Sequence, residues 1–157
     1  MKKEKSYFLL FAVIFILADQ IAKYFASRLN ETFPVILNIF HVTFVKNTGI
    51  IWGAFPGANS LITWLYVVVI GMLVYFYDQF PKDKFSRIML AFVFAGVIGN
   101  FIDRIAFGYV IDFIDFRIWP VFNIADICLN VGIIGIIVKG ILGKGNSGFF
   151  DNTNKYR

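Results

Sequence analysis

The sequence is poor in the side chains that most often build metal and redox centres. It contains one cysteine, Cys128, and one histidine, His41, so no intramolecular disulfide can form and no CxxC pair exists. His41 also has no HExxH partner, which excludes the usual zinc-peptidase motif. We therefore expect neither a metal nor a cofactor. Cys128 is expected to be a small buried hydrophobic side chain.

Charged residues are scarce as well. Asp, Glu, Lys and Arg make up 16% of the 157 residues, whereas 59% are hydrophobic and 19% are aromatic. With a mean hydropathy of +0.72, this composition lies outside that of soluble domains and indicates an integral membrane protein, expected to be one domain over residues 1–157. The formal net charge of +5 does not indicate nucleic-acid binding, because the basic residues are scattered.

Four apolar runs predict membrane-spanning helices, since a hydrocarbon core of about 30 Å needs about 20 helical residues. The predicted spans are residues 7–25, 61–77, 88–105 and 122–142. The first begins like a signal peptide, but no small-x-small cleavage site follows it, so it is interpreted as a retained helix. Gly-x-x-Gly spacings at 96/99 and 132/135 predict close packing of the third and fourth helices.

Lys and Arg between the spans or near their ends predict the orientation, because cytoplasmic loops carry an excess of them. One side has ten basic residues: Lys2, Lys3, Lys5, Lys82, Lys84, Arg87, Lys139, Lys144, Lys155 and Arg157. The other side has four: Arg28, Lys46, Arg104 and Arg117. Both termini are therefore predicted to be cytoplasmic, with segments 27–60 and 106–121 on the outer face. A tail over residues 143–157 is expected to be disordered.

The first outer segment predicts a small β-sheet. Residues 33–45 are rich in Val, Ile, Phe and Thr, and the turn signal Asn47-Thr48-Gly49 follows them. Trp52 and Phe55 come next, so the whole segment is apolar enough to rest on the membrane interface.

Two aspartates, Asp112 and Asp126, lie in strongly apolar surroundings without a basic neighbour at i±3 or i±4. A charge at hydrocarbon depth costs roughly 2.5 to 3.5 kcal/mol, so an unpaired acid there indicates function. Two carboxylates brought together share one proton: the ionised one can deprotonate water while the protonated one polarises a carbonyl. The alternative, that each is a solvated carboxylate at the water boundary, stays open.

Other polar residues gather at the outer ends of the spans. The third span carries Asn100, Asp103 and Arg104 on one face, and the fourth carries Asn123 with Asp126 and Asn130. Asp19 and Lys23 lie one turn apart on the first span, and Asp103 and Arg104 are neighbours on the third. We interpret both as charge pairs: in each, the two charges pair with one another or with charges on facing helices.

Three other functions fit parts of the sequence. Lys23 and Ser27, at i and i+4, could form the Ser-Lys pair of a serine enzyme. Acids within a membrane could also relay protons in a small transporter, although no internal repeat is present. A third reading, a structural protein that only anchors other proteins, predicts binding that needs neither aspartate.

Five ordered blocks lie along the chain from the first predicted span to the fourth. They are Asp19 with Lys23; Lys46-Asn47-Thr48-Gly49 with Trp52-Gly53-Ala54-Phe55; Gly96-x-x-Gly99-Asn100-x-x-Asp103-Arg104; Gly108-Tyr109-Val110-Ile111-Asp112-Phe113; and Phe122-Asn123-Ile124-Ala125-Asp126. Together they resemble the conserved blocks of lipoprotein signal peptidase, also called signal peptidase II. The sequence departs from that pattern at Ile50-Ile51, where small residues are usual, and at Ile127-Cys128, where Ser is common.

The resemblance implies a bacterial inner-membrane aspartic endopeptidase that removes the signal peptide of diacylglyceryl-modified prolipoproteins just before the lipidated cysteine. It implies four transmembrane helices, an extracytoplasmic sheet that cradles the substrate, and a short outer lid segment before the fourth helix. Membrane lipids are further partners, and the chain is expected to be monomeric.

By the same resemblance, Asp112 and Asp126 take the catalytic positions. The residues that shape the site and hold the substrate backbone are Asn47, Gly49, Asn100, Arg104 and Asn123. Asp19, Lys23 and Asp103 take structural positions. Asp115, three residues after Asp112, is a rival acid on physical grounds but falls outside the family motif.

Overall fold

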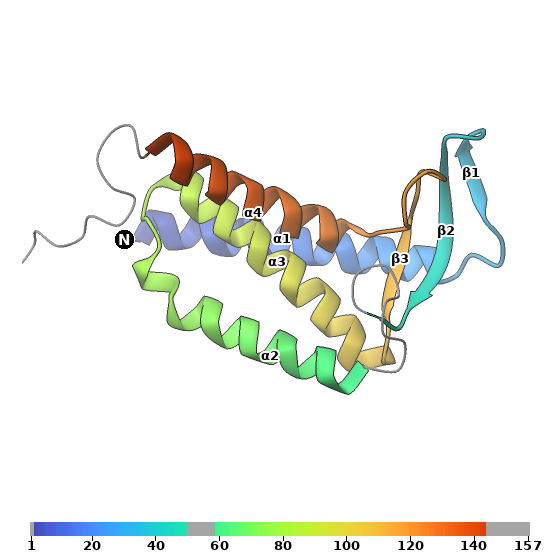
Figure 1. Ribbon diagram of the computed structural model, residues 1–157, viewed down its shortest axis with the longest axis horizontal. Helices are drawn as coiled ribbons and strands as arrows, with labels where there is room; N and C mark the ends of the chain where they lie inside the picture. Colours follow the sequence, from blue (N-terminus) through green and yellow to red (C-terminus); the bar gives the residue numbers. More distant parts are fainter. Residues whose placement is uncertain (1, 50–58, 144–157) are drawn as a thin grey trace, which may run out of the picture.

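Apolar helices run side by side in the computed structural model, which describes residues 2–49 and 59–143, and a small sheet lies at one end of them (Figure 1). The helices are α1 (Lys2–Ala26), α2 (Asn59–Tyr75), α3 (Lys84–Phe107) and α4 (Ile124–Gly143), with a 3-10 helix, η1 (Tyr77–Gln79), after α2. Among the described residues, α1, α3 and α4 are long and apolar enough to cross a membrane, and α2 is a shorter apolar helix. The protein is therefore a helical protein of membrane type.

The predicted spans match these helices to within a few residues. α1 and α3 begin earlier than predicted, because helical hydrogen bonding continues into polar segments that a search for apolar runs leaves out. Asp83 caps α3, since its carboxylate accepts a hydrogen bond from the backbone N–H of Ser86 at 3.1 Å. Gly143, expected in the tail, belongs to α4, and residues 144–157 lie outside the described residues.

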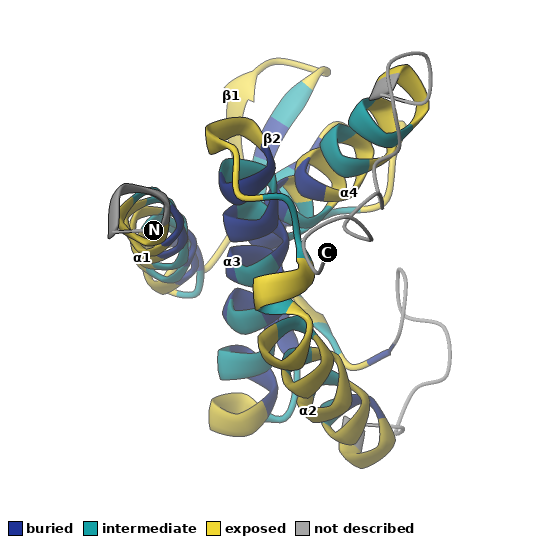
Figure 2. Cartoon of the chain, turned by 90° about the vertical axis from the view of Figure 1, so that its left-hand side faces the viewer, coloured by how far each residue is buried: buried dark blue, intermediate teal, exposed yellow. Residues whose placement is uncertain are grey.

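Helix α3 is the centre of the arrangement. It packs against α1, α2 and α4, and Figure 2 shows its buried residues surrounded by the other three helices. α1 also contacts α4, but within the described residues no Cα atom of α2 lies within 8 Å of a Cα atom of α1 or α4. Two gaps therefore flank α2, one toward α1 and one toward α4. Cys128 is buried on α4 and unpaired, as predicted.

Glycines allow α3 and α4 to approach closely, which confirms the prediction from their spacing. A Cβ atom on Gly96 would collide with the backbone oxygen of Ala125. A Cβ atom on Gly132 would lie 2.6 Å from Cγ2 of Val93 and 2.7 Å from the backbone oxygen of Met89. Small residues at such contacts bring helix backbones together where lipid offers no hydrophobic driving force.

The sheet has three antiparallel strands in the order β1 (Phe33–Ile36), β2 (Phe40–Asn47) and β3 (Val110–Asp115). The first two fall within the predicted outer sheet, whereas β3 was not predicted as a strand. Five of the six residues in β3 are buried, so the strand lacks the alternation of apolar and polar residues that reveals a half-buried strand. Trp52 and Phe55, assigned to the interface, lie outside the described residues.

We predict that Gly132→Ala destabilises the protein and that Gly140→Ala, on the same helix, does not. The new methyl group at position 132 must push α3 and α4 apart, at a cost of about 1–3 kcal/mol. At position 140 it meets nothing within 4 Å, and alanine favours a helix over glycine by up to about 1 kcal/mol. Thermal unfolding in detergent compares them, and equal melting temperatures would contradict the packing role of Gly132.

Candidate active site

The predicted site residues meet where the sheet joins the helices. Asp112 lies on β3, and Asp126 lies in the first turn of α4. Both line a cavity of about 690 Å³ whose other lining residues include Asn47, Gly49, Asn100 and Arg104. The two carboxylates, 14 residues apart in sequence, thus face one space.

Asn123 and Asp126 form a reciprocal cap at the start of α4. The Asn123 side-chain oxygen accepts a hydrogen bond from the backbone N–H of Asp126 at 2.9 Å, and the Asp126 carboxylate accepts one from the backbone N–H of Asn123 at 3.2 Å. Such a capping box satisfies N–H groups that the helix leaves unpaired. The start of the helix therefore also fixes the direction of the Asp126 carboxylate.

Each oxygen of the two carboxylates accepts a hydrogen bond from a neutral donor. For Asp112 the donors are the side-chain amides of Asn47 at 2.9 Å and Asn123 at 2.7 Å. For Asp126 they are the side-chain amide of Asn100 at 2.9 Å and the backbone N–H of Asn123. Asn123 therefore contacts both carboxylates and holds them in a fixed arrangement.

Burial, followed by the nearby negative charge of Asp126, raises the pKa of Asp112 to about 7. Only 3% of Asp112 is exposed, so water does little to stabilise its ionised form. Hydrogen bonds from Asn47 and Asn123 favour that form without outweighing burial. Asp112 can therefore hold a proton at a pH where an ordinary aspartate has lost it.

Behind the carboxylates, Lys23 forms a buried cluster of charges. Its ammonium group lies 2.8 Å from the carboxylate of Asp19 and 3.0 Å from that of Asp103. The same group donates to the side-chain oxygen of Asn100 at 3.0 Å. Asp103 thus pairs with Lys23 across the helices, whereas its neighbour Arg104 donates to the backbone oxygen of Gly49.

Asp115, the rival acid, has its own partners on the sheet. Its carboxylate accepts hydrogen bonds from the hydroxyl of Thr43 at 3.0 Å and from the backbone N–H of Arg117 at 2.8 Å, and it pairs with the Arg117 side chain. Burial alone would raise the pKa of Asp115, but these contacts outweigh burial and lower it. Asp115 is not among the residues that line the cavity.

The Ser-Lys alternative does not fit the geometry. The hydroxyl of Ser27 donates to the backbone oxygen of Tyr24 at 2.9 Å. Lys23 is 1% exposed, and its ammonium group is occupied by Asp19, Asp103 and Asn100. A buried, fully partnered ammonium cannot serve as a base for an exposed hydroxyl one turn away.

Comparison with known proteins gives the same family as the sequence blocks. The family model for signal peptidase (SPase) II matches residues 11–142. The chain belongs to the signal peptidase II family. A lipoprotein signal peptidase of Microcystis aeruginosa is 39% identical to it, with 88% of this chain and 94% of the relative covered. One of Fusobacterium nucleatum is 40% identical, with 86% of each covered.

Solved structures agree with this family membership. A bacterial membrane enzyme determined by the in meso method at 2.3 Å resolution is similar with a TM-score of 0.83 at 33% identity, over 90% of this chain and 91% of that one. A second, determined at 1.9 Å resolution, has a TM-score of 0.75 at 35% identity, over 83% and 90% of the two chains. The helices and sheet described above are thus shared with membrane enzymes.

The cavity residues that sequence reasoning missed in this signal peptidase II family member include two aromatic ones. Tyr66 lies on α2 and interacts with the side chain of Asn100, and Trp119 lies in the connection between β3 and α4. Neither is marked by the sequence, because aromatic residues are common throughout the chain. The sequence also did not predict which face of α2 packs against α3, because this helix is apolar on all sides.

We predict that Asp112 makes the folded protein less stable as the pH rises from about 4 to about 7. A raised pKa means that the folded state binds this proton more tightly than the unfolded chain, so stability present at low pH is lost across that interval. The loss is at most about 4 kcal/mol, because each pKa unit corresponds to about 1.36 kcal/mol. Asp112→Asn should flatten this part of the stability profile, measured by thermal unfolding in detergent between about pH 5 and pH 8.

Asp115→Asn is the matched control. Because the pKa of Asp115 is lowered, its contribution to stability is lost only as the pH falls below the usual range of aspartate. Its slope between about pH 5 and pH 8 should therefore equal that of the unmodified protein. A steep slope that survives in Asp112→Asn would contradict the role given to the Asp112 proton.

Proposed function

We propose that this signal peptidase II family member is an aspartic endopeptidase with Asp112 and Asp126 as its catalytic residues. It removes the signal peptide of diacylglyceryl-modified prolipoproteins and cuts just before the lipidated cysteine. The observation that carries the proposal is the position of Asn123, which donates hydrogen bonds to both carboxylates at the wall of a shared cavity. Two acids held this way can handle one proton between them.

In the proposed reaction, one carboxylate is ionised and the other is protonated. The ionised carboxylate takes a proton from water, and the resulting hydroxide oxygen attacks the scissile carbonyl carbon. The protonated carboxyl gives its proton to the carbonyl oxygen. When the tetrahedral intermediate collapses, the first carboxyl passes its proton to the leaving amine of the cysteine, and the second recovers its own.

We assign the resting proton to Asp112 and the role of base to Asp126. The pKa of Asp112, raised to about 7, supports the first assignment. Lys23 supports the second, because it donates to the oxygen of Asn100 while the amide N–H of Asn100 donates to Asp126. A cation on the oxygen polarises the amide and strengthens its N–H as a donor to the ionised form of Asp126.

The remaining conserved-block residues complete the site. Asn47 donates to Asp112, and its side-chain oxygen accepts from the backbone N–H of Gly49 at 3.1 Å, which draws the end of β2 toward the dyad. Arg104, 4% exposed, donates to the backbone oxygen of Gly49. We propose that this corner of the cavity positions the substrate backbone.

The apolar side of the cavity suits a signal peptide and a lipid. Ile62 of α2 and Val131 and Ile134 of α4 line it, and the two helices do not contact each other within the described residues. We propose that the substrate reaches the dyad laterally through this gap. The diacylglyceryl group then stays in the bilayer while the peptide bond meets the carboxylates.

The segment over residues 116–121 is the proposed lid. Its ends are held together by hydrogen bonds between Ile114 and Phe122 at 2.8 and 3.2 Å. Between them Ile118 is 93% exposed, and Trp119 lines the cavity. A loop with fixed ends and an apolar tip can cover a bound peptide without disturbing β3 or α4.

The charges and the fold support a membrane arrangement. We propose that α2, whose 17 residues are at the lower limit for a span, crosses the membrane as the fourth helix, with both termini cytoplasmic. The dyad then lies at the outer face of the bacterial inner membrane. Exposed apolar residues on and after β1, such as Ile36 and Leu37, would rest on the interface, and the enzyme is proposed to act as a monomer.

Cleavage assays with single substitutions test the dyad. Asp112→Asn and Asp126→Asn should each lower the cleavage rate of a diacylglyceryl-modified prolipoprotein by at least about 10³-fold, because each removes a proton acceptor or donor. Asp115→Asn is the matched control, since Asp115 is an aspartate on the same strand as Asp112 that does not line the cavity. It should keep near-normal activity.

The same assay separates the alternatives. Near-normal cleavage by either dyad variant, with the protein folded in detergent, would overturn the assignment. Loss of cleavage in Asp115→Asn alone would move the catalytic role to the other acid of β3. Ser27→Ala should be fully active, because the Ser27 hydroxyl has no contact with the ammonium group of Lys23.

A further inference from the structure

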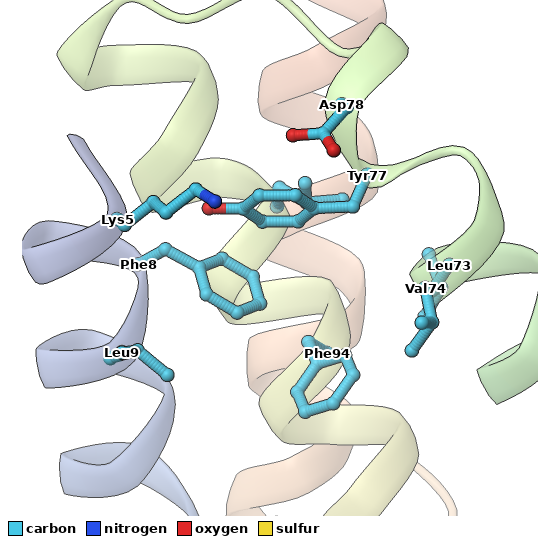
Figure 3. A pocket seen from close by; sticks show the side chains of 9 residues that line it. Lys5, Phe8, Leu9, Leu73, Val74, Tyr77, Asp78 and Phe94 are labelled. Atoms are coloured by element: carbon cyan, nitrogen blue, oxygen red, sulfur yellow. The ribbon is translucent and has the colours of Figure 1, made fainter. Parts of the chain in front are cut away.

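A second cavity lies at the end of the helices opposite the sheet. It has a volume of about 280 Å³ and is bounded by α1, by α3 and by the end of α2 with η1. Most of its lining is apolar: Phe8, Leu9, Leu73, Val74, Leu90 and Phe94. Figure 3 shows Lys5, Tyr77 and Asp78 toward one end of this space, with Leu9 and Phe94 farther along it.

The cavity occupies the gap between α1 and α2. Both helices pack on α3, but within the described residues no Cα atom of α1 lies within 8 Å of a Cα atom of α2. Leu9 is 59% exposed and Val74 is 62% exposed, so the slot opens sideways to the surroundings of the helices. In a membrane, an apolar slot of this kind loses packing contacts unless an acyl chain fills it. Its volume is about nine times that of a water molecule, about 30 Å³, and suits part of one chain.

The polar end of the cavity carries one charge of each sign. Lys5 extends from α1 and Asp78 from η1, and within the described part of the chain neither has a hydrogen bond or an ion pair. Both are exposed. Two opposite charges that do not pair with each other can bind a ligand that carries both a phosphate and an ammonium group.

The ring between these charges is held in place by the protein itself. The guanidinium of Arg87 donates to the backbone oxygen of Tyr77 at 2.9 Å and lies 4.3 Å from the centre of the Tyr77 ring. Phe8 packs edge-on against the same ring at 4.9 Å between centroids. The end of the cavity is therefore preorganised, and the buried guanidinium of Arg87 adds positive potential next to Tyr77.

We propose that this cavity binds one phospholipid whose headgroup carries a phosphate and a primary ammonium, as phosphoethanolamine does. One acyl chain lies in the apolar slot between α1 and α2, the phosphate pairs with Lys5, and the ammonium donates to Asp78. The lipid belongs to the leaflet opposite the dyad and closes the gap between the two helices. A phosphocholine headgroup fits less well, because its quaternary ammonium has no N–H to donate to Asp78. A purely anionic headgroup also fits less well, because its negative charge would lie near the Asp78 carboxylate.

Native mass spectrometry of the full chain tests the site with three lipids that share their acyl chains and carry phosphoethanolamine, phosphocholine or phosphoglycerol headgroups. The phosphoethanolamine lipid should be retained best. Lys5→Gln and Asp78→Asn should each weaken its retention about threefold to fivefold, as expected for partly exposed charge contacts. Asp78→Asn should not weaken retention of the phosphoglycerol lipid. Leu73→Trp, which fills the slot, should weaken retention of all three.

Lys82→Gln is the matched control, because Lys82 is an exposed lysine between η1 and α3 that does not line the cavity. It should leave retention unchanged. Equal retention of the three lipids, unaffected by Lys5→Gln and Asp78→Asn, would overturn the site. If the phosphoglycerol lipid is retained best and Asp78→Asn does not weaken its retention, the assignment of a phosphoethanolamine headgroup is wrong.

Both charge substitutions are on exposed side chains, so they test the site even if Leu73→Trp does not fold. The inference does not depend on the catalytic proposal. Lipid retention is measured without substrate, and Lys5→Gln and Asp78→Asn should keep their cleavage activity if Lys5 and Asp78 serve only the lipid. If cleavage depends on Asp112 and Asp126 but the three lipids are retained equally, only the lipid proposal has failed. If the lipids are retained selectively but cleavage does not depend on the two aspartates, only the catalytic proposal has failed.

Discussion

The rest of the structure depends on the neutralisation of one buried cation, Lys23. Its ammonium group has two carboxylates, Asp19 and Asp103, within 3.0 Å, and all three residues are almost completely buried. Asp19 also accepts from the backbone N–H of Ala125 at 2.8 Å, and Asp103 from that of Ile111 at 2.9 Å. One set of charges therefore joins α1, α3, the start of α4 and β3. Loss of Lys23 would leave two buried carboxylates without a counter-charge, at a cost of about 3–5 kcal/mol.

This charge cluster and close backbone packing make α3 the shared surface for the other helices. A Cβ atom on Gly99 would lie 2.8 Å from a carboxylate oxygen of Asp19, so the α1 charges reach the α3 backbone only because glycine is there. α2 has no comparable link and contacts α3 without touching α1 or α4 in the described regions. The two cavities lie on either side of α2 for this reason, one beside the dyad and one at the opposite end.

Sequence reasoning found what hydropathy, spacing and charge isolation can reveal. The four helices were predicted because apolar runs persist over their lengths, and Asp112 and Asp126 were singled out because they lack nearby basic residues. The strand β3 was missed because burial on both faces removes its alternation, and without that strand the pairing of Val45 with Asp112 could not be foreseen. The partner of Asp103 was also undetermined, since a helical pattern shows neighbours on one helix but not which residue of another helix faces them.

Neutral amides around the carboxylates suit the shared proton of the proposed dyad. If Lys23 contacted Asp126 directly, its charge would compensate the acid, and no proton would be needed to lower the cost of burial. Asn100 instead stands between them, accepting from Lys23 and donating to Asp126. Asn47 and Asn123 likewise satisfy Asp112 without adding charge, so burial and Asp126 still raise its pKa to about 7. Three asparagines thus bind two buried acids without adding a counter-charge, which is the condition that the proposed aspartic dyad requires.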